Sequence, residues 1–339
     1  MNTRHHFLHR PARALVALLV TAGLAACGVV PTGSGSHVTY TRIRNQPHNV
    51  YDAHAKVVGG KLYSFGGYDT TVSGGRPTTP TGRSFVYDPA SDTWTPIASL
   101  PGGGLTHAGI ATDGTNIFIV GGYPKDAAGT GEVHGTTKAW KYTPPTNRYD
   151  SLPDLPAARG SGQLEYLNGQ LHYFGGTDVN WRDVTNHYVL DVKGGATAWR
   201  EAAPLPQPRN HFGSAVVNGR IYAIGGQIGQ EEGEVTQRDV YAYDPSTNAW
   251  TPRAPLPAAR SHIAGSTFVL GGRIIVAGGE YAWGNHASEV SAYDPVTNTW
   301  MAWPHLPAKR PSGSADALGN GFIFTGGYNT SEGWRATVK

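Results

Sequence analysis

Short apolar runs that each end in a pair of glycines recur through most of the chain. The pairs begin at residues 66, 121, 175, 225, 278 and 326, so successive pairs are 55, 54, 50, 53 and 48 residues apart. Each run has the length and the β-branched and aromatic content of a strand, as in Lys61 to Phe65 and Arg220 to Ile224. Self-similarity at such a period is typical of repeat architectures.

Each run is preceded by a two-residue signal for a tight turn. The six dipeptides are Gly59-Gly60, Asp113-Gly114, Asn168-Gly169, Asn218-Gly219, Gly271-Gly272 and Asn320-Gly321. These residues accept the positive φ angles of turns that join antiparallel strands. A second hairpin is predicted downstream, where a tyrosine stands seven residues before a tryptophan, as at Tyr243 and Trp250. Two hairpins per repeat predict six four-stranded antiparallel sheets.

The two ends of the repeat region complement each other. Tyr40 with Pro47 matches the aromatic-to-proline spacing of Trp94 with Pro101, whereas the last repeat stops after its third strand, near Trp334. We therefore expect the N-terminal segment to supply the outer strand of the last sheet. Such a strand closes a ring of sheets and removes the open seam.

The repeated glycine pair with a spaced Tyr and Trp resembles the kelch family, over residues 38 to 339. This resemblance implies an all-β, six-bladed propeller, like the exported bacterial N-acetylneuraminate mutarotases and the propeller domain of galactose oxidase. The copper radical chemistry of galactose oxidase needs a cysteine that is crosslinked to a tyrosine. Cys27 is the only cysteine and precedes the repeats, so the sequence excludes that chemistry.

The first 26 residues have the pattern of a lipoprotein signal peptide. The apolar stretch from Ala14 to Ala26 is too short to span a bilayer and follows a basic segment. The stretch Leu24-Ala25-Ala26-Cys27 looks like a bacterial lipobox, so we expect a lipid on Cys27 and a flexible tether over residues 27–37. The expected protein is an exported monomer on the cell envelope, at the outer membrane or the periplasmic side rather than the inner membrane.

Charge and composition exclude some functions. The formal net charge of +3 equals the contribution of Arg4, Arg10 and Arg13 in the leader, so the rest of the chain lacks the basic excess that nucleic acids require. The chain has 14 histidines but no His-x-x-x-His or His-Glu-x-x-His spacing, so no metal and no cofactor are predicted. His211 and His262 occupy matching repeat positions, which favours a structural role.

Loops between the second and third strands of each sheet share one face with the connections between sheets. These loops are long and polar, and such loops on a rigid scaffold are the expected place for binding. The candidate binding residues on them are Tyr68, Tyr123, Trp181, Arg182, Tyr281, Trp283, His286 and Tyr328.

Four arginines each follow a sheet-linking proline by three residues, with Gly104 and Val50 at the other two equivalent positions. They are Arg159, Arg209, Arg260 and Arg310. Sixfold symmetry would bring their guanidinium groups toward the axis, where they would bind a carboxylate or another anion. The alternative is that this arginine belongs to the repeat consensus and packs between blades.

Two classes of function remain open. The leading hypothesis is a lipid-anchored module that binds a carbohydrate or an envelope protein on the long-loop face. The alternative is a metal-free sugar mutarotase or epimerase of the sialic-acid type. In that enzyme Glu231, Glu232 or Glu280 would act as general acid and base beside the arginines. A scaffold role in an envelope complex is the third possibility.

Overall fold

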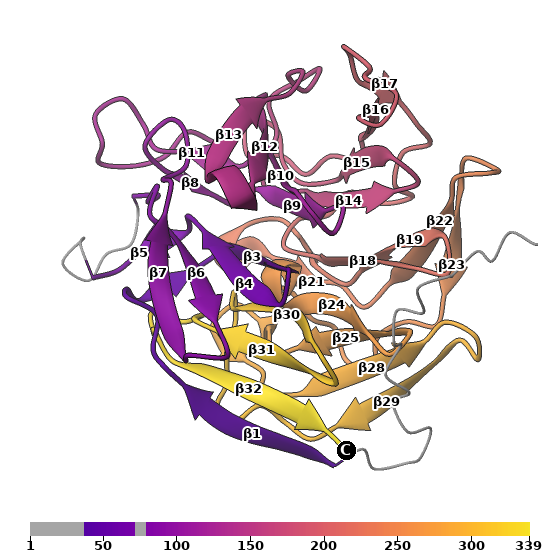
Figure 1. Cartoon of the computed structure of the whole chain (residues 1–339). Helices are drawn as coiled ribbons and strands as arrows, with labels where there is room; N and C mark the ends of the chain where they lie inside the picture. Colours follow the sequence, from indigo (N-terminus) through magenta and orange to yellow (C-terminus); the bar gives the residue numbers. More distant parts are fainter. Residues whose placement is uncertain (1–36, 72–78) are drawn as a thin grey trace, which may run out of the picture.

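Six four-stranded antiparallel sheets surround a common axis (Figure 1). The computed structural model describes residues 37–71 and 79–339, so Cys27 and the leader lie outside the described residues. The innermost strand of each sheet contacts the innermost strands of both neighbouring sheets. The chain is therefore a six-bladed β-propeller, which confirms the fold predicted from the repeats.

The blades follow one another along the chain. The first three blades comprise β3 (His54–Val58), β4 (Lys61–Phe65), β6 (Ser84–Asp88) and β7 (Thr93–Ile97); β9 (Gly109–Thr112), β10 (Ile117–Val120), β12 (Ala139–Thr143) and β13 (Arg148–Ser151); and β14 (Gln163–Leu167), β15 (Gln170–Phe174), β16 (His187–Asp191) and β17 (Arg200–Glu201). The next two comprise β18 (Gly213–Val217), β19 (Arg220–Ile224), β22 (Val240–Asp244) and β23 (Ala249–Arg253); and β24 (Thr267–Leu270), β25 (Arg273–Ala277), β28 (Val290–Asp294) and β29 (Thr299–Trp303).

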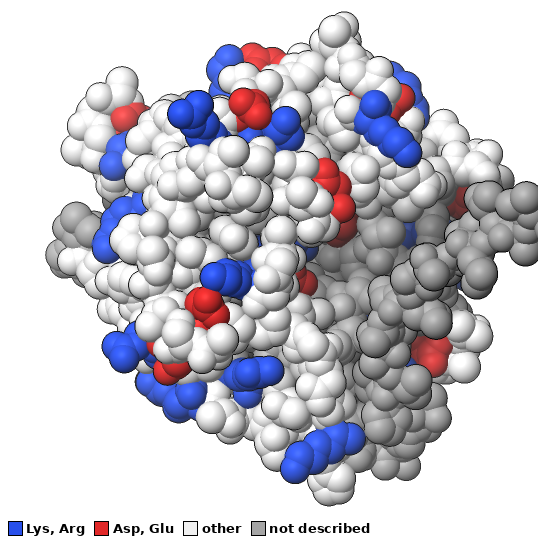
Figure 2. Space-filling model, in the orientation of Figure 1, with Lys and Arg blue, Asp and Glu red and all other residues white. Residues whose placement is uncertain are grey.

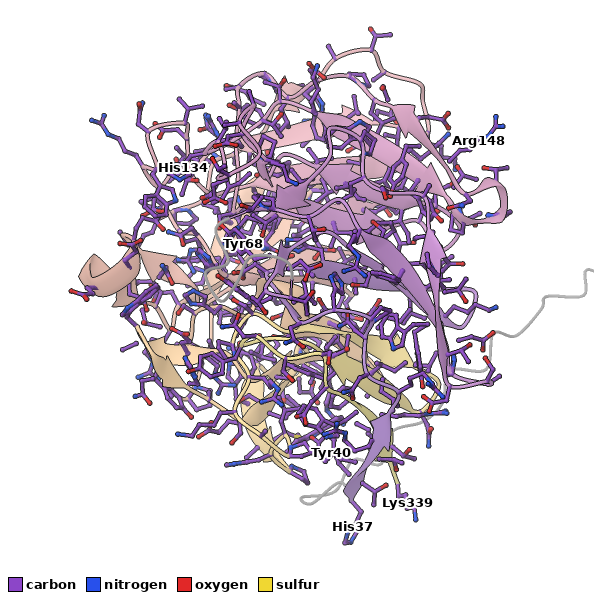
Figure 3. The ribbon with its side chains drawn as sticks, turned by 90° about the vertical axis from the view of Figure 1, so that its left-hand side faces the viewer. His37, Tyr40, Tyr68, His134, Arg148 and Lys339 are labelled. Carbon is purple, nitrogen blue, oxygen red and sulfur yellow. The ribbon has the colours of Figure 1, made fainter. Side chains whose placement is uncertain are left out.

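Both ends of the described chain build the last blade. It comprises β30 (Ser314–Leu318), β31 (Gly321–Thr325), β32 (Gly333–Val338) and β1 (Val38–Ile43). Strand β1 pairs with β32 in antiparallel register from Val38 opposite Val338 to Ile43 opposite Gly333. His37 and Lys339 consequently lie together in Figure 3, and the amide of Lys339 donates to the carbonyl of His37. The predicted closure by an N-terminal outer strand is confirmed.

Short two-stranded sheets extend the loops above the blades. They pair β2 (Val50–Tyr51) with β5 (Tyr68–Asp69), β8 (Leu105–Thr106) with β11 (Tyr123–Pro124), β20 (Gln227–Ile228) with β21 (Val235–Thr236), and β26 (Glu280–Ala282) with β27 (Asn285–His286). Three short 3₁₀ turns complete the described elements: η1 (Pro144–Thr146), η2 (Glu231–Gly233) and η3 (Ala264–Ser266). His134 lies on the opposite side of the molecule from Arg148 of the β12–β13 hairpin, as strand parity requires (Figure 3).

The repeated tryptophans join neighbouring blades. The indole Nε1 of Trp250 donates to the carbonyl of Ala203 in the preceding blade at 2.9 Å. Equivalent bonds run from Trp94, Trp199 and Trp300, at 2.9, 2.8 and 2.9 Å. Where the second repeat has Tyr149 instead, its hydroxyl donates to the carbonyl of Ala98 at 3.0 Å. The substitution therefore keeps the contact between blades.

Two of the predicted tight turns differ in detail. The last predicted dipeptide was Asn320-Gly321, but β31 already begins at Gly321, so the turn is Gly319-Asn320, with Gly319 at φ +61°. The β9–β10 connection is longer than two residues, because Asp113 accepts bonds from the amides of Thr115 and Asn116. Asn218 and Gly219 follow the prediction, with φ values of +51° and +72°.

The described surface carries both signs of charge. Basic and acidic side chains lie interspersed over the face drawn in Figure 2. Ion pairs such as Lys61 with Asp88 and Arg220 with Asp244 join some of them. Over residues 37–71 and 79–339, none of the helices is both long and apolar enough to cross a bilayer.

Candidate functional site

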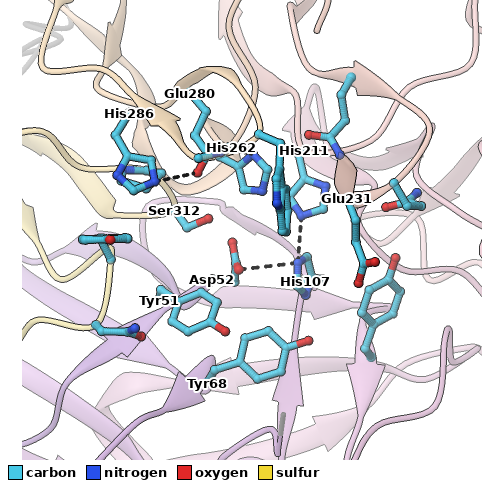
Figure 4. A pocket seen from close by; sticks show the side chains of 18 of the residues that line it. Tyr51, Asp52, Tyr68, His107, His211, Glu231, His262, Glu280, His286 and Ser312 are labelled. Atoms are coloured by element: carbon cyan, nitrogen blue, oxygen red, sulfur yellow. Dashed lines mark hydrogen bonds and ion pairs between the residues drawn. The ribbon is translucent and has the colours of Figure 1, made fainter. Parts of the chain in front are cut away.

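A cavity of about 680 Å³ opens on the long-loop face at the axis of the propeller (Figure 4). Its volume lies in the range of small-molecule sites. Aromatic side chains from several blades form much of its wall; they are Tyr51, Tyr68, Tyr123, Trp181, Trp283 and Tyr328. Carboxyl groups and histidines supply most of the polar groups; they are Asp52, Glu132, Glu231, Glu280, His107, His211, His262 and His286.

A ring of six equivalent residues lies at the base of this cavity, and all of them except Ser161 line it. Each precedes an innermost strand and has a left-handed backbone, with φ between +49° and +57°; they are Asp52, His107, Ser161, His211, His262 and Ser312. Non-glycine residues adopt this conformation rarely, and Asp and His tolerate it better than most. Its cost persists where the surroundings enforce it, commonly at functional sites. Backbone bonds link the ring, as from the amide of Ser312 to the carbonyl of His262 at 3.0 Å.

Two of the ring histidines meet at the axis. The Nε2 atoms of His107 and His211 are 2.9 Å apart, and they meet across Ser161, whose side chain is small. The Oδ2 atom of Asp52 lies 3.6 Å from the Nε2 atom of His107. The ring of His262 packs against that of His211, with centroids 4.3 Å apart. Burial lowers the pKa of His107 and His211 well below the usual value and that of His262 to about 3.

One buried and one partly buried carboxyl group flank the cavity above the ring. Glu280 on β26 lies 3.2 Å from the Nε2 atom of His286 and 3.7 Å from the Nδ1 atom of His262. Burial and the nearby Glu234 raise the pKa of Glu280 to about 7. Glu132 accepts a hydrogen bond from the hydroxyl of Tyr68, and burial raises its pKa to about 7 as well. Both groups therefore change charge near neutral pH, where a general acid or base works best.

The structure brings most of the predicted loop residues to the cavity. Tyr68, Tyr123, Trp181, Trp283, His286, Tyr328, Glu231 and Glu280 line it. Arg182, Tyr281 and Glu232 do not. Trp181 stacks on the ring of His134, with centroids 4.4 Å apart and planes inclined by 14°. The exposed fractions of Trp283 and Tyr328 are 51% and 57%, so these two rings are open to a ligand at the cavity mouth.

The four repeated arginines do not reach the cavity. Arg209 is fully buried and donates to the carbonyls of Gly225 and Asp239 in its own blade at 3.0 and 3.2 Å. Arg260 binds the carbonyl of Glu289 in the same way, at 3.2 Å.

The other two arginines are held at side chains. Arg159 donates to Asn186, and Arg310 donates to Glu332 and lies over the ring of Trp334. The residues that face the axis are those two positions later in each repeat. The expectation that the guanidinium groups converge there is thus corrected. Their contacts are structural, as in the packing alternative, but they lie within each arginine's own blade rather than between blades.

The repeat equivalence itself needs one adjustment. The amide of Gly226 donates to the carbonyl of Arg260, and the amide of Gly67 donates to the carbonyl of Leu105 in the same way, at 2.8 and 2.9 Å. Leu105, not Gly104, is therefore the second-blade equivalent of the arginines. The glycine pairs allow this approach: a Cβ on Gly278 would lie 2.3 Å from the carbonyl oxygen of Arg310.

Sequence reasoning missed most of the cavity floor. Asp52 and Glu132 were not candidates, and the matching positions of His211 and His262 favoured a structural role. Counting two residues on from each arginine position would have aligned Asp52, His107, His211 and His262 as one ring. Sixfold symmetry brings this position to the axis, so the polar residues found there could have predicted the cavity floor.

Comparisons with known proteins agree with this architecture. A model of the kelch-repeat domain of the KLHDC2, KLHL20 and DRC7 proteins matches residues 114–327, and a kelch-motif model matches residues 51–101. This chain belongs to the kelch-repeat family. Kelch-like protein terF of Aspergillus terreus is 30% identical over 248 residues, which cover 71% of this chain and 52% of that protein.

Other relatives are more distant. Beta-scruin of Limulus polyphemus is 26% identical over 230 residues, 64% of this chain and 24% of that protein. The kelch chain thus spans about half, or less, of the length of these curated relatives. The solved structure of YjhT superposes with a TM-score of 0.70 at 16% identity and covers 88% of this chain and 99% of that one. A likeness at this identity shows the shared fold.

Proposed function

We propose that this kelch propeller binds an uncharged polyhydroxylated small molecule, of the sugar class, in the axial cavity. The observation that carries the proposal is the lining: aromatic rings alternate with carboxyl and imidazole groups, and no Lys or Arg of the described residues reaches the cavity. Aromatic faces pack on the apolar faces of sugar rings, and carboxyl and imidazole groups bind hydroxyls.

The missing basic groups distinguish between sugar classes. A sialic or uronic acid needs a cation for its carboxylate, and the repeated arginines are engaged elsewhere. An acidic ligand would also meet Asp52, Glu132, Glu231 and Glu280. The lining therefore favours a neutral sugar over the sialic-acid type.

Catalysis by proton transfer is the second candidate. It is favoured by the raised pKa values of Glu132 and Glu280, both about 7, on the wall of one cavity. A carboxyl group that is half protonated at neutral pH both donates and accepts protons, which is what anomer interconversion requires. Anomer-exchange NMR on any sugar that binds tests this step.

Attachment to the cell envelope through Cys27 is proposed from the sequence pattern at residues 24–27. The test is metabolic labelling with a radioactive fatty acid in a bacterial host, comparing the chain with its Cys27→Ser variant. We expect label on the parent chain and none on the variant. Equal labelling, or none on either, would contradict the anchor.

A thermal-shift screen of the whole chain against neutral, acidic and amino sugars tests the binding proposal, because a ligand of the native state raises the unfolding midpoint. We expect hits among neutral sugars that weaken at least tenfold in Trp283→Ala. Val296→Ala is the control, since Val296 is also an exposed apolar side chain but lies in the β28–β29 hairpin, away from the cavity. A response confined to acidic sugars, or no response to sugars at all, would contradict the proposal; the latter would favour a protein ligand.

A further inference from the structure

Three potential metal ligands converge on one point at the cavity floor, although they come from different blades. The Nε2 atoms of His107 and His211 and a carboxylate oxygen of Asp52 all lie within 4.8 Å of one another (Figure 4). Metal-ligand spacing does not reveal this cluster, because the three positions are 55 and 104 residues apart in the sequence.

Hydrogen bonds at Nδ1 of His211, on the side of the ring away from His107, fix the tautomer of His211. The amide nitrogen of Asn210 donates to the carboxylate of Asp183 and to the carbonyl of Gly229, the latter at 3.3 Å. The amide oxygen of Asn210 therefore faces Nδ1 of His211, with which it makes a short contact. An amide oxygen can only accept, so the neutral ring carries its hydrogen on Nδ1 and a lone pair on Nε2.

The tautomer of His107 is fixed in the same sense. The hydroxyl of Thr106 donates its hydrogen to the backbone carbonyl of Asp52 at 3.0 Å. The same hydroxyl lies 3.2 Å from Nδ1 of His107 and has only lone pairs left to offer. Nδ1 of His107 must then be the donor, and its Nε2 also presents a lone pair.

The two Nε2 lone pairs consequently face each other across 2.9 Å. Two acceptors at that distance repel unless a cation lies between them or beside them. A carboxyl oxygen of Asp52 lies on the same side, 3.6 Å from Nε2 of His107. No lysine or arginine among the described residues reaches the cavity to fill this place.

We propose that Asp52, His107 and His211 bind a divalent first-row transition-metal ion, with its remaining coordination positions open to the axial cavity. Two histidines and one carboxylate form a known catalytic ligand set for zinc and for non-haem iron. Metal–ligand bonds of about 2.0 to 2.2 Å in a tetrahedral site place ligand atoms about 3.3 Å apart. The observed separations of 2.9 and 3.6 Å lie on either side of that value.

The surroundings of the three ligands have the form of an outer coordination shell. Ligating histidines normally donate their other N–H to a fixed acceptor, which orients the ring. Asn210 and Thr106 do this here, and both are fully buried. The left-handed backbone at Asp52, His107 and His211 directs all three side chains to the axis at some conformational cost. This inference does not rest on sugar binding; a bound ion would add positive charge to the cavity, so the preference for a neutral sugar holds for the metal-free protein.

The test is a titration of the whole chain with Co²⁺ and with Zn²⁺ after dialysis against a chelator. Visible absorption reports Co²⁺ coordination, and calorimetry gives the affinity for both ions. Ligand variants are Asp52→Asn, His107→Asn and His211→Asn, because asparagine tolerates the left-handed backbone but is too short to replace a histidine ligand. The leader histidines His5, His6 and His9 stay in every variant, so only differences between variants are interpreted.

Two further variants separate this site from its neighbours. Thr106→Val removes the acceptor for Nδ1 of His107 with little change in shape, and loss of such an outer-shell group weakens metal binding about 10- to 100-fold. Glu234→Gln is the matched control, because Glu234, His262 and Glu280 form a second cluster of potential ligands in the described chain. Circular dichroism and thermal midpoints without metal show whether each variant folds.

In each titration, with Co²⁺ or with Zn²⁺, the parent chain should bind one metal ion more than any of the three ligand variants. Affinity should weaken at least 100-fold in these variants, fall about 10- to 100-fold in Thr106→Val and stay within twofold in Glu234→Gln. Equal binding by the parent chain and the folded ligand variants would overturn the proposal. Loss of metal binding only in Glu234→Gln would also overturn it. So would the absence of metal binding by the parent chain below about 1 mM, and a proton shared by His107 and His211 would then explain their close approach.

Discussion

Replacing Glu280 by glutamine should stabilise the protein at alkaline pH and leave it almost unchanged at acidic pH. The carboxyl group is buried in the cavity wall, and burial raises its pKa from 4.5 to about 7. In the unfolded chain the group ionises near its ordinary value, so folding opposes ionisation. Its contribution to stability is fully present below about pH 4.5 and is lost as the pH rises through about 7.

The size of the effect follows from the shift in pKa. A difference of about 2.5 units at about 1.36 kcal/mol per unit gives an upper value of about 3.4 kcal/mol above pH 8. Water at the cavity mouth screens the charge, so we expect about 2 kcal/mol. The glutamine side chain of the variant keeps an oxygen that can accept from the amide of Gly284, as one carboxylate oxygen of Glu280 does at 3.3 Å.

The assay is urea unfolding of the parent chain and of Glu280→Gln at pH 4.5 and pH 8.5, followed by tryptophan fluorescence. Glu201→Gln is the control, because Glu201 is exposed on β17, and it should change the unfolding free energy by less than about 0.5 kcal/mol at either pH. If Glu280→Gln shifts stability equally at both pH values, or destabilises the protein at pH 8.5, the reasoning about the buried carboxyl group is refuted.

Three further changes test other parts of the structure. Asn248→Gly keeps the left-handed turn but removes the side-chain oxygen that accepts from the hydroxyl of Tyr243 and from the amide of Ala203 in the neighbouring blade. The free energy of unfolding, measured in urea, should fall by about 2 kcal/mol. Arg209→Met should cost about 2 kcal/mol, because the buried carbonyl of Gly225 loses its donor while that of Asp239 keeps the amide of Gly225. The variant should leave sugar affinity within twofold; a tenfold loss would show that Arg209 contributes to the binding site. Tyr68→Phe should raise the pKa of Glu132 above about 7, seen by carbon NMR of labelled glutamate; an unchanged or lower pKa would contradict the assigned hydrogen bond.

The repeat pattern predicts the blades because their contacts are local in the repeat. The Tyr243 and Trp250 spacing places both residues on one hairpin, and each of the four repeated tryptophans bonds to the previous blade. The closing pair of β1 and β32 was also predictable, since a strand missing at one end was present at the other. The sequence period therefore predicts the fold and the contacts on the outer strands of each blade.

The cavity floor was not predictable in the same way. The arginines and the ring residues are two positions apart, and the left-handed backbone lies at the ring residue, the one whose side chain faces the axis. Arg209 turns into its own blade, whereas His211 turns to the centre. Repeat equivalence gives a position in each blade but no direction for its side chain. Glu132 was missed because the loops between the second and third strands differ in sequence from blade to blade, so repeat equivalence does not align it with another residue.

A crystal structure of the whole protein with the neutral sugar that gives the largest thermal shift tests the central claim most directly. We predict electron density for one sugar in the axial cavity, with a ring face on Trp283 or Tyr328 and hydroxyls within hydrogen-bond distance of Glu280 or Glu132. Density for the sugar outside the cavity, or a carboxylate held by Arg209 or Arg260 when an acidic sugar is used, would contradict it.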